Sequence, residues 1–283
     1  MTPIFSALAF LVLAPFVGGL LTGVDRVFSA RLQSRVGPPI LQPFYDVLKL
    51  MEKHTVTVHR FQLYYVSCFL VFAVISGMIF FSGGDLLLVI FALTVAAVFL
   101  ALGAYSPHSP YSKAGAEREL LQMMSYEPML LLTAMGMYRV AHSFRVADLV
   151  VYPEPLLKSL PLMFIGFLFV LTIKFRKSPF DLAASHHAHQ ELVRGLATEF
   201  SGTTLAVMEV AHWYENVLLL GMTYLFFAAY PVWAAVIAVL LVYALEVVID
   251  NLYARLTWRL TLKSSWLTAG TLGLANLLAV VYM

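Results

Sequence analysis

The sequence predicts an all-α membrane protein that crosses the bilayer several times. Of its 283 residues, 61% are hydrophobic and only 12% are charged, and the mean hydropathy is +0.84. A soluble domain of this length does not need so much apolar surface. Charged residues also divide the chain into apolar runs of roughly 20 residues, which is the length of a helix that crosses a bilayer.

About eight transmembrane helices are expected within a single transmembrane domain, residues 1–283. They cover approximately 3–24, 62–83, 85–105, 119–141, 156–174, 202–226, 231–253 and 264–282. No cationic segment precedes the first run and no small-residue cleavage site follows it, so it is interpreted as a retained span rather than a signal peptide. The connections 25–61, 106–118 and 175–201 leave no room for a soluble domain and are expected to be cytoplasmic docking loops.

The 18 lysines and arginines are divided unequally between the two sides that these spans define. The side opposite the three docking loops has only Arg139, Arg145 and Lys158, and the other 15 cations lie on the side of the loops. Because cytoplasmic loops carry an excess of cations, both termini are predicted to lie outside a cytoplasmic (inner) membrane. The cations form no basic tail, so nucleic acid is not an expected partner.

A short amphipathic segment follows the first span. After Pro43, apolar residues recur at helical spacing and charged residues lie opposite them: Phe44, Val47, Leu48 and Met51 against Asp46, Lys49 and Lys53. A helix of this kind lies along the membrane surface. It is either an interfacial anchor or a docking platform for a cytoplasmic partner.

Ionisable residues inside the predicted spans are the main functional signal, because a charge at the centre of a bilayer costs at least about 2–3 kcal/mol. Glu209, His212 and Glu215 follow one another at three-residue spacing, which places them on roughly one helix face. We predict an ion path formed by Glu127, Glu209, His212, Glu215, Glu246, Asp250 and Glu199. Two structural alternatives stay open: Glu127 could be neutral at a helix contact, and Asp250 could pair with an arginine at the interface.

The connection before the sixth span carries three histidines, His186, His187 and His189. Their crowding within four residues matches no metal-ligand spacing, and the single cysteine, Cys68, excludes a thiolate cluster. No metal site and no cofactor are therefore expected in this chain. A cytoplasmic recognition loop is the preferred interpretation of the histidines.

Three motifs resemble the membrane subunit of respiratory complex I that forms the floor of the quinone chamber (the H, or first, subunit). The first is QSRVGPP followed by QPFYDVLKL, the second is ERELLQMMSYEP, and the third is SPFDL followed by ELVRG and TEFSG. The resemblance covers roughly the whole chain and implies a core of eight helices. It also implies a docking face for soluble partners, which we place at Arg26, Arg31, Arg35, Gln42, Pro43, Asp46, Lys49, Glu119, Asp181, His186, His187, His189, Glu191 and Arg194.

One departure decides between branches of this family. Quinone-reducing members usually carry an acidic segment between the first and second parts of the last motif, whereas this chain has AASHHAHQ. That loop, and the short length of the chain, resemble the energy-converting nickel–iron (NiFe) hydrogenases of the Ech and formate hydrogenlyase group. Glu209 and Glu215 do not fit the complex I spacing, so no one-to-one role is carried over to them.

The resemblance implies a subunit that is not catalytic on its own within an oxidoreductase complex. It would couple ferredoxin and hydrogen redox chemistry to H⁺ or Na⁺ movement. The nickel–iron centre and the iron–sulfur clusters would belong to the large, small and iron–sulfur subunits on the cytoplasmic face, and an antiporter-like membrane subunit would lie beside this chain. The alternatives are a quinone-chamber subunit of a complex I-type enzyme and a stand-alone ion transporter.

Overall fold

The structure is a computed structural model that describes residues 3–54, 59–183 and 194–282. Secondary structure in these residues is helical apart from one isolated backbone bridge, between Asp85 and Arg145. The predicted all-α class is therefore confirmed. The remaining residues, which include His186, His187, His189 and Glu191, lie outside the described part of the chain.

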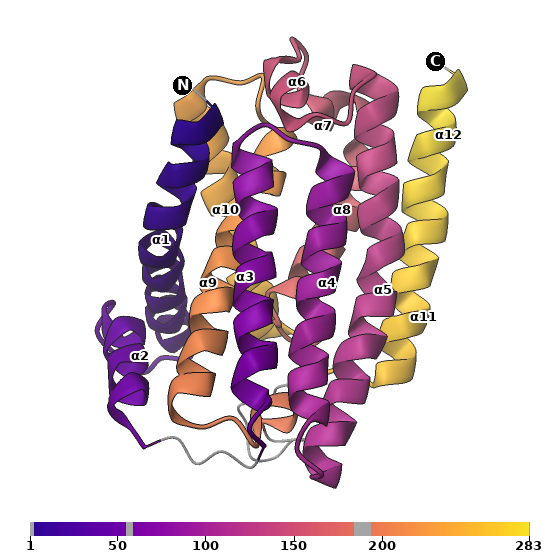
Figure 1. The fold of residues 1–283 in the computed structure, drawn as a ribbon. Coiled ribbons are helices and arrows are strands. Elements are labelled where there is room, and N and C mark those ends of the chain that lie inside the picture. Colours follow the sequence, from indigo (N-terminus) through magenta and orange to yellow (C-terminus); the bar gives the residue numbers. More distant parts are fainter. Residues whose placement is uncertain (1–2, 55–58, 184–193, 283) are drawn as a thin grey trace.

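The long helices lie side by side, and the first and last described residues are at the same end of the bundle (Figure 1). These helices are α1 (Pro3–Leu32), α3 (Gln62–Phe81), α4 (Leu86–Tyr105), α5 (Pro110–Ala141), α8 (Pro161–Lys174), α9 (Gly202–Leu225), α10 (Val232–Leu252) and α11 (Trp258–Thr268), which continues through the π-helical turn η2 (Ala269–Gly273) into α12 (Leu274–Tyr282).

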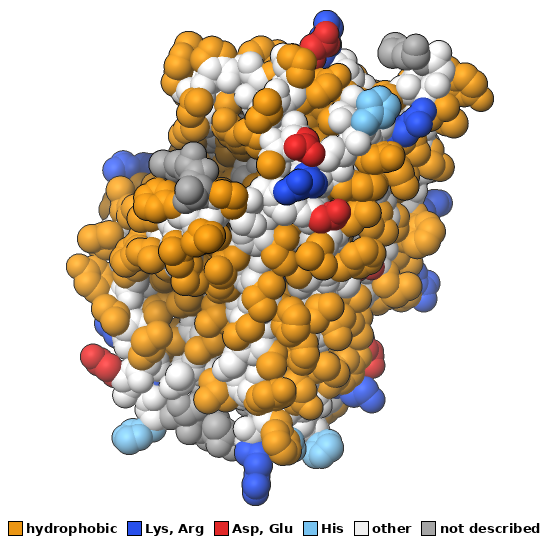
Figure 2. Space-filling view, turned by 45° about the horizontal axis from the view of Figure 1, so that its top comes forward, with side chains coloured by type: hydrophobic (Ala, Val, Ile, Leu, Met, Phe, Trp, Pro, Cys, Tyr) orange, Lys and Arg blue, Asp and Glu red, His pale blue; other side chains and the backbone are white. Residues whose placement is uncertain are grey.

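Among the described residues, five helices are long and apolar enough to cross a membrane: α1, α3, α4, α10 and the continuous helix Trp258–Tyr282. Helix α8 is apolar but shorter, and α5 and α9 are as long but more polar. Exposed hydrophobic side chains cover much of the molecule, as expected of a surface that faces lipid (Figure 2). The chain is a multi-pass membrane protein, and the predicted number of eight spans stays a prediction.

Several helix boundaries differ from the predicted ones. Helix α1 continues eight residues past 24, and its backbone ends in a Schellman motif with Ser34 in the left-handed region (φ 56°). There Arg35 N donates to Ala30 O at 2.9 Å and Ser34 N donates to Arg31 O at 3.0 Å. Cations at the end of a span therefore did not end the helix, because cations are favourable near a helix C-terminus.

The other boundaries shift for local reasons. Helix α5 begins at Pro110 instead of 119, because proline suits the first helical turn. Proline also starts α8 at Pro161, after the short helices α6 (Val146–Val151) and α7 (Leu156–Ser159). The amphipathic segment forms α2 (Gln42–Glu52), which confirms the predicted helix, and its position along the membrane surface stays a prediction.

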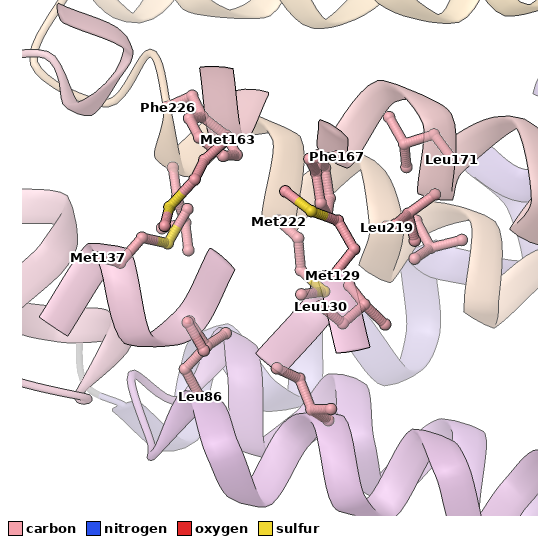
Figure 3. Packing of buried hydrophobic residues seen from close by; sticks show 14 of the residues in the cluster. Leu86, Met129, Leu130, Met137, Met163, Phe167, Leu171, Leu219, Met222 and Phe226 are labelled. Carbon is pink, nitrogen blue, oxygen red and sulfur yellow. The ribbon is translucent and has the colours of Figure 1, made fainter. Parts of the chain in front are cut away.

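The main core lies between α5, α8 and α9, where methionine and phenylalanine side chains interlock (Figure 3). Met129 and Met137 of α5 face Met163 and Phe167 of α8, with Phe226 beyond the end of α9. Unbranched methionines fill irregular gaps between helices. This core holds the three helices that carry most of the candidate site.

Helix α1 approaches α9 closely because Gly18 has no side chain. A Cβ atom at Gly18 would lie 2.5 Å from the backbone oxygen of Trp213. Phe44 of α2 lies against the same tryptophan, with ring centroids 5.2 Å apart. The contact fixes α1 and α2 against the face of α9 that carries Glu209 and His212.

Candidate functional site

The site is built around a buried ion pair between the end of α8 and the middle of α9. Lys174 Nζ lies 2.6 Å from Glu215 Oε1, and the two side chains are 5% and 8% exposed. His212, one turn earlier on α9, places Nδ1 3.2 Å from the other carboxylate oxygen. Lys174 also lies 4.5 Å from the centre of the Tyr126 ring of α5. A buried pair of this kind requires full hydrogen bonding to offset desolvation.

The way α8 ends directs three successive cations to different partners. Arg176 adopts the left-handed region (φ 54°), and Lys177 N donates to Thr172 O at 3.1 Å, so the helix ends in another Schellman motif. Lys174 therefore remains inside the bundle. Arg176 and Lys177 lie beyond the last turn and reach other helices.

Lys177 joins α1 to α10. Its ammonium group contacts Asp25 of α1 and lies 3.4 Å from Asp250 of α10. The backbone N–H of Ser178 donates to the other Asp250 oxygen at 2.8 Å. Asp250 therefore pairs with the cation Lys177, whereas the alternative left open for it was a pair with an arginine.

Arg176 joins the same segment to α5, with NH2 3.1 Å from Glu119 Oε1. Gln122 of α5 donates to the backbone oxygen of Phe180, which holds the following Asp181 close to the bundle. Burial raises the pKa of Asp181 from its usual 3.8 to about 7, although Arg255 and Arg176 act in the opposite direction. This carboxyl therefore titrates near neutral pH.

A cavity of about 300 Å³ lies beside these ion pairs, between α1, α9 and α10. Trp213, Phe175 and Tyr243 line it together with Glu209, His212 and Asn216 of α9. The other charged residues at its wall are Asp25, Arg26, Lys174, Arg176, Lys177, Arg194 and Asp250. The cavity wall thus combines charged side chains with apolar and aromatic ones.

A second cavity of about 390 Å³ shares four residues with the first: Asp25, Arg26, Lys177 and Asp250. It is bounded by the segment after α1, where Arg35 Nε donates to Gln33 Oε1 at 2.8 Å and Gln33 Nε2 donates to Asn251 of α10 at 2.8 Å. The two cavities therefore adjoin at the ion pairs of Lys177, between the segment after α1 and the middle of α9.

Glu246 of α10 is fully buried one turn before Asp250. Thr172 of α8 lies beside it, but the Thr172 hydroxyl donates to Leu168 O at 3.1 Å, so neither carboxyl oxygen of Glu246 has a hydrogen-bond partner among the described residues. A buried carboxyl without a partner is costly. Such a group is a candidate for a step that changes its protonation or hydration.

The structure brings together part of the predicted ion path. Glu209, His212, Glu215 and Asp250 lie around the first cavity or its ion pairs. Glu127 is partly buried but lines neither cavity, and within the described residues it has no ion pair. Glu199 lies before α9, where its backbone oxygen accepts a hydrogen bond from Gln62 at 3.2 Å.

Some of the predicted docking residues contact one another, and others are exposed. Arg26 of α1 pairs with Asp46 of α2 at 2.7 Å, and Gln42 donates to the same carboxylate at 2.8 Å. Burial acts to raise the pKa of Asp46, but the hydrogen bonds from Arg26 and Gln42 outweigh it and lower the pKa. Pro43 lies in the first turn of α2 and is buried. Arg26, Arg31, Arg35, Lys49 and Arg194 are exposed.

Sequence reasoning missed Asp25, Lys174, Lys177 and Tyr126 as members of the site. Asp25 and Lys174 stand at the ends of predicted spans, where single charges are usually solvated. The available signal was that opposite charges stand at span ends on the same predicted side. Among the described residues, no group of three or more His, Cys, Asp and Glu side chains could hold a metal ion.

Fold and site define the class of this protein as a polytopic helical membrane protein with a charged cluster at one end of its bundle. Residues 5–281 match the family model described as NADH dehydrogenase, and the chain belongs to this family. The predicted resemblance to the first subunit of complex I is thereby confirmed.

Relatives come from two kinds of complex. The chain is 33% identical to formate hydrogenlyase subunit 4 of Escherichia coli K12 over 223 residues, covering 73% of this chain and 70% of that protein. It is 30% identical to hydrogenase-4 component C of the same organism, over 92% of this chain and 91% of that one. The H subunit of the NADH-quinone oxidoreductase of Syntrophotalea carbinolica is 30% identical, over 70% and 68%.

A solved structure confirms the fold. A chain of the membrane-bound sulfane sulfur reductase, an archaeal respiratory membrane complex, superposes on this chain with a TM-score of 0.85. The superposition covers 99% of this chain and 100% of that one at 22% identity. All these relatives belong to membrane complexes with several subunits, so partner subunits are expected for this chain as well.

Proposed function

We propose that this chain is the membrane subunit of an energy-converting nickel–iron hydrogenase, and that it couples redox chemistry in docked soluble subunits to H⁺ or Na⁺ movement. Similarity to formate hydrogenlyase subunit 4 and hydrogenase-4 component C supports the class. The observation that carries the mechanism is the buried cluster of Lys174, Glu215 and His212, which adjoins a charged cavity.

The proposed coupling is electrostatic. Electron transfer between ferredoxin and protons changes the charge next to the docking end of the bundle. Ion pairs at that end, Arg176–Glu119 and Lys177–Asp25, are made by cations two and three residues after Lys174 of the buried pair. In a low-dielectric interior a nearby charge shifts ion-pair and protonation equilibria strongly. Glu209, Glu215 and Glu246 would respond by changing protonation or hydration.

This chain would hold no redox cofactor itself. The nickel–iron centre and the iron–sulfur clusters would reside in partner subunits docked on α2, on the segment after α1 and on the segment after α8. An antiporter-like membrane subunit would receive the coupled ion. The exposed cations Arg31, Arg35 and Lys49 at this end suit an acidic partner surface.

A quinone-chamber subunit is the second candidate, because the H subunit of NADH-quinone oxidoreductase is also a relative and the first cavity lies between α1 and α9. Eight charged residues line this cavity: Asp25, Arg26, Lys174, Arg176, Lys177, Arg194, Glu209 and Asp250. An isoprenoid tail needs an apolar channel. Apolar residues, among them Phe175, Leu205 and Met208, line the same cavity, so the preference for the hydrogenase function rests on the two hydrogenase relatives.

The test is to purify the complex through an affinity tag on this chain in a mild detergent and to measure nickel, iron and flavin. The expected result is nickel and several irons in stoichiometric partner subunits, with hydrogen evolution from reduced ferredoxin. Iron and flavin without nickel would overturn the hydrogenase proposal in favour of the quinone reductase. A lone metal-free protein that transports ions would overturn both.

A further inference from the structure

An aromatic and cationic patch covers the outward side of α11 and shares no residue with the two cavities described above. Trp258, Leu262 and Trp266 follow one another at four-residue spacing and form a stripe on one helix face. Arg259 and Lys263 stand beside that stripe, and the five side chains line a shallow surface hollow of about 390 Å³. We call these five residues the α11 patch.

The two cations of the patch have no acidic partner. No ion pair joins Arg259 or Lys263 to another residue within the part of the chain that the structure describes. The Arg259 guanidinium carbon instead lies 5.2 Å from the ring centre of Trp258. Both cations are exposed, so they are available to an anion.

The patch faces away from the bundle. On the inner side of α11, Thr261 and Ser265 are buried, and Ser265 donates to the backbone oxygen of Ser125 in α5. Helix α11 lies at the edge of the bundle beside α5 (Figure 1). The α11 patch therefore opens toward whatever surrounds the bundle in the membrane.

The helix beyond the patch presents an apolar surface. Leu267, Leu274 and Leu278 are exposed at 62%, 46% and 54%. Gly270 leaves open space between them, because a Cβ atom there would meet no atom within 4 Å. A ligand with a charged head at the α11 patch and a long apolar tail would fit along this side of α11 and α12.

From this juxtaposition we infer that the α11 patch binds the headgroup of an anionic phospholipid, whose acyl chains lie along α11 and α12. Tryptophan rings prefer the level of the lipid headgroups, and lysine and arginine near that level attract anionic lipids. An acidic protein segment would account for the two cations. It would not account for the exposed leucines and the open space at Gly270.

The test compares lipid binding by the purified complex using native mass spectrometry, with phosphatidylglycerol or phosphatidylcholine added at matched concentrations. The wild-type complex is expected to retain phosphatidylglycerol in preference to phosphatidylcholine. Arg259→Gln/Lys263→Gln should weaken phosphatidylglycerol binding about 30-fold, since each cation contributes about fivefold near a charged surface. The matched control, Arg139→Gln/Lys158→Gln, removes two cations at the other end of the bundle and should leave binding unchanged.

Two further variants distinguish loss of the lipid-binding site from damage to the fold. Arg259→Lys/Lys263→Arg preserves both charges and should keep the preference for phosphatidylglycerol. Trp266→Leu should shorten lipid retention without removing the charge preference. Equal phosphatidylglycerol binding by the wild type and the double glutamine variant would overturn the inference. So would a photo-crosslinker at position 263 that captures an acidic segment of a neighbouring subunit instead of lipid.

Discussion

Lys174 and Glu215 form an ion pair inside the bundle, with 2.6 Å between Nζ and Oε1. Nδ1 of His212 lies 3.2 Å from the second carboxylate oxygen of Glu215, and the Tyr126 ring lies under the ammonium group of Lys174. Four ionisable or aromatic groups from α5, α8 and α9 thus meet at one buried point. That point connects the docking end of the molecule to the middle of α9.

Removing one member of this pair should be far more damaging than removing both. Lys174→Met leaves Glu215 buried without its cation and is expected to cost about 3–5 kcal/mol of unfolding free energy. Lys174→Met/Glu215→Leu should recover most of that loss, because two apolar side chains of similar size need no desolvation. Thermal unfolding of the purified protein in detergent measures both.

The control for this comparison is Lys158→Met, which removes a cation whose side chain is 73% exposed and 3.5 Å from Glu154. An exposed pair of this kind contributes less than about 1 kcal/mol. If Lys174→Met is no more destabilising than Lys158→Met, the buried pair does not have the role assigned to it.

Ionisation of Asp181 should lower the free energy of unfolding as the pH rises. Its pKa in the folded protein is about 7, against 3.8 for the free side chain, so the folded state favours the neutral acid. The stability that the neutral acid contributes is fully present below about pH 4 and is lost as the pH rises through about 7. The difference corresponds to about 4 kcal/mol as an upper limit, because the residue is partly exposed.

Asp181→Asn removes this dependence. The melting temperature of the variant should exceed that of the wild type at pH 8 and approach it at pH 5, while Asp148→Asn, at the other end of the bundle, serves as the comparison. Parallel melting curves for wild type and Asp181→Asn from pH 5 to pH 8 would contradict the assignment.

Apolar periodicity and charge placement predicted the helices well, because a membrane span is long and its signal is repeated over about 20 residues. The ends of helices were predicted less well. Leu32 and Pro110 are boundaries set by backbone capping and proline, and the charges at 26 and 113–119 did not mark them. Local chemistry at one or two residues decides such boundaries.

Only part of the site was predicted, and the reason differs from that for the helix ends. Glu209, His212 and Glu215 were recognised because they lie inside a span, where any acid is unusual. Asp25 and Lys177 were not, because their importance depends on a contact between α1 and the segment after α8, 152 residues apart in sequence. A contact of that kind depends on how the helices assemble.

Gly18 should tolerate no side chain. In Gly18→Ala the new Cβ would lie 2.5 Å from the Trp213 backbone oxygen, so α1 and α9 would have to separate. The expected cost is about 1–3 kcal/mol, as for other overpacked contacts, together with a change in the cavity between these helices. Gly270→Ala is the matched control, since nothing lies within 4 Å, and it should be neutral or stabilising by up to about 1 kcal/mol. Equal melting temperatures for the two variants would count against the close α1–α9 contact.

Two substitutions of Glu246 distinguish a structural role of this buried acid from a role in ion coupling. Glu246→Leu should stabilise the protein, because it removes a fully buried carboxyl that has no hydrogen-bond partner among the described residues.

If Glu246 belongs to the ion path, Glu246→Gln should leave hydrogen evolution by the assembled complex largely intact and reduce the coupled ion gradient at least about tenfold, because glutamine cannot carry the charge of an ion path. The measurement pairs hydrogen production with a pH-sensitive or sodium-sensitive dye in proteoliposomes. Glu154→Gln, whose side chain is 58% exposed at the other end, should change neither. A Glu246→Gln complex that builds the same gradient as wild type would show that this carboxyl has no part in coupling, because glutamine keeps its shape but cannot carry its charge or its proton.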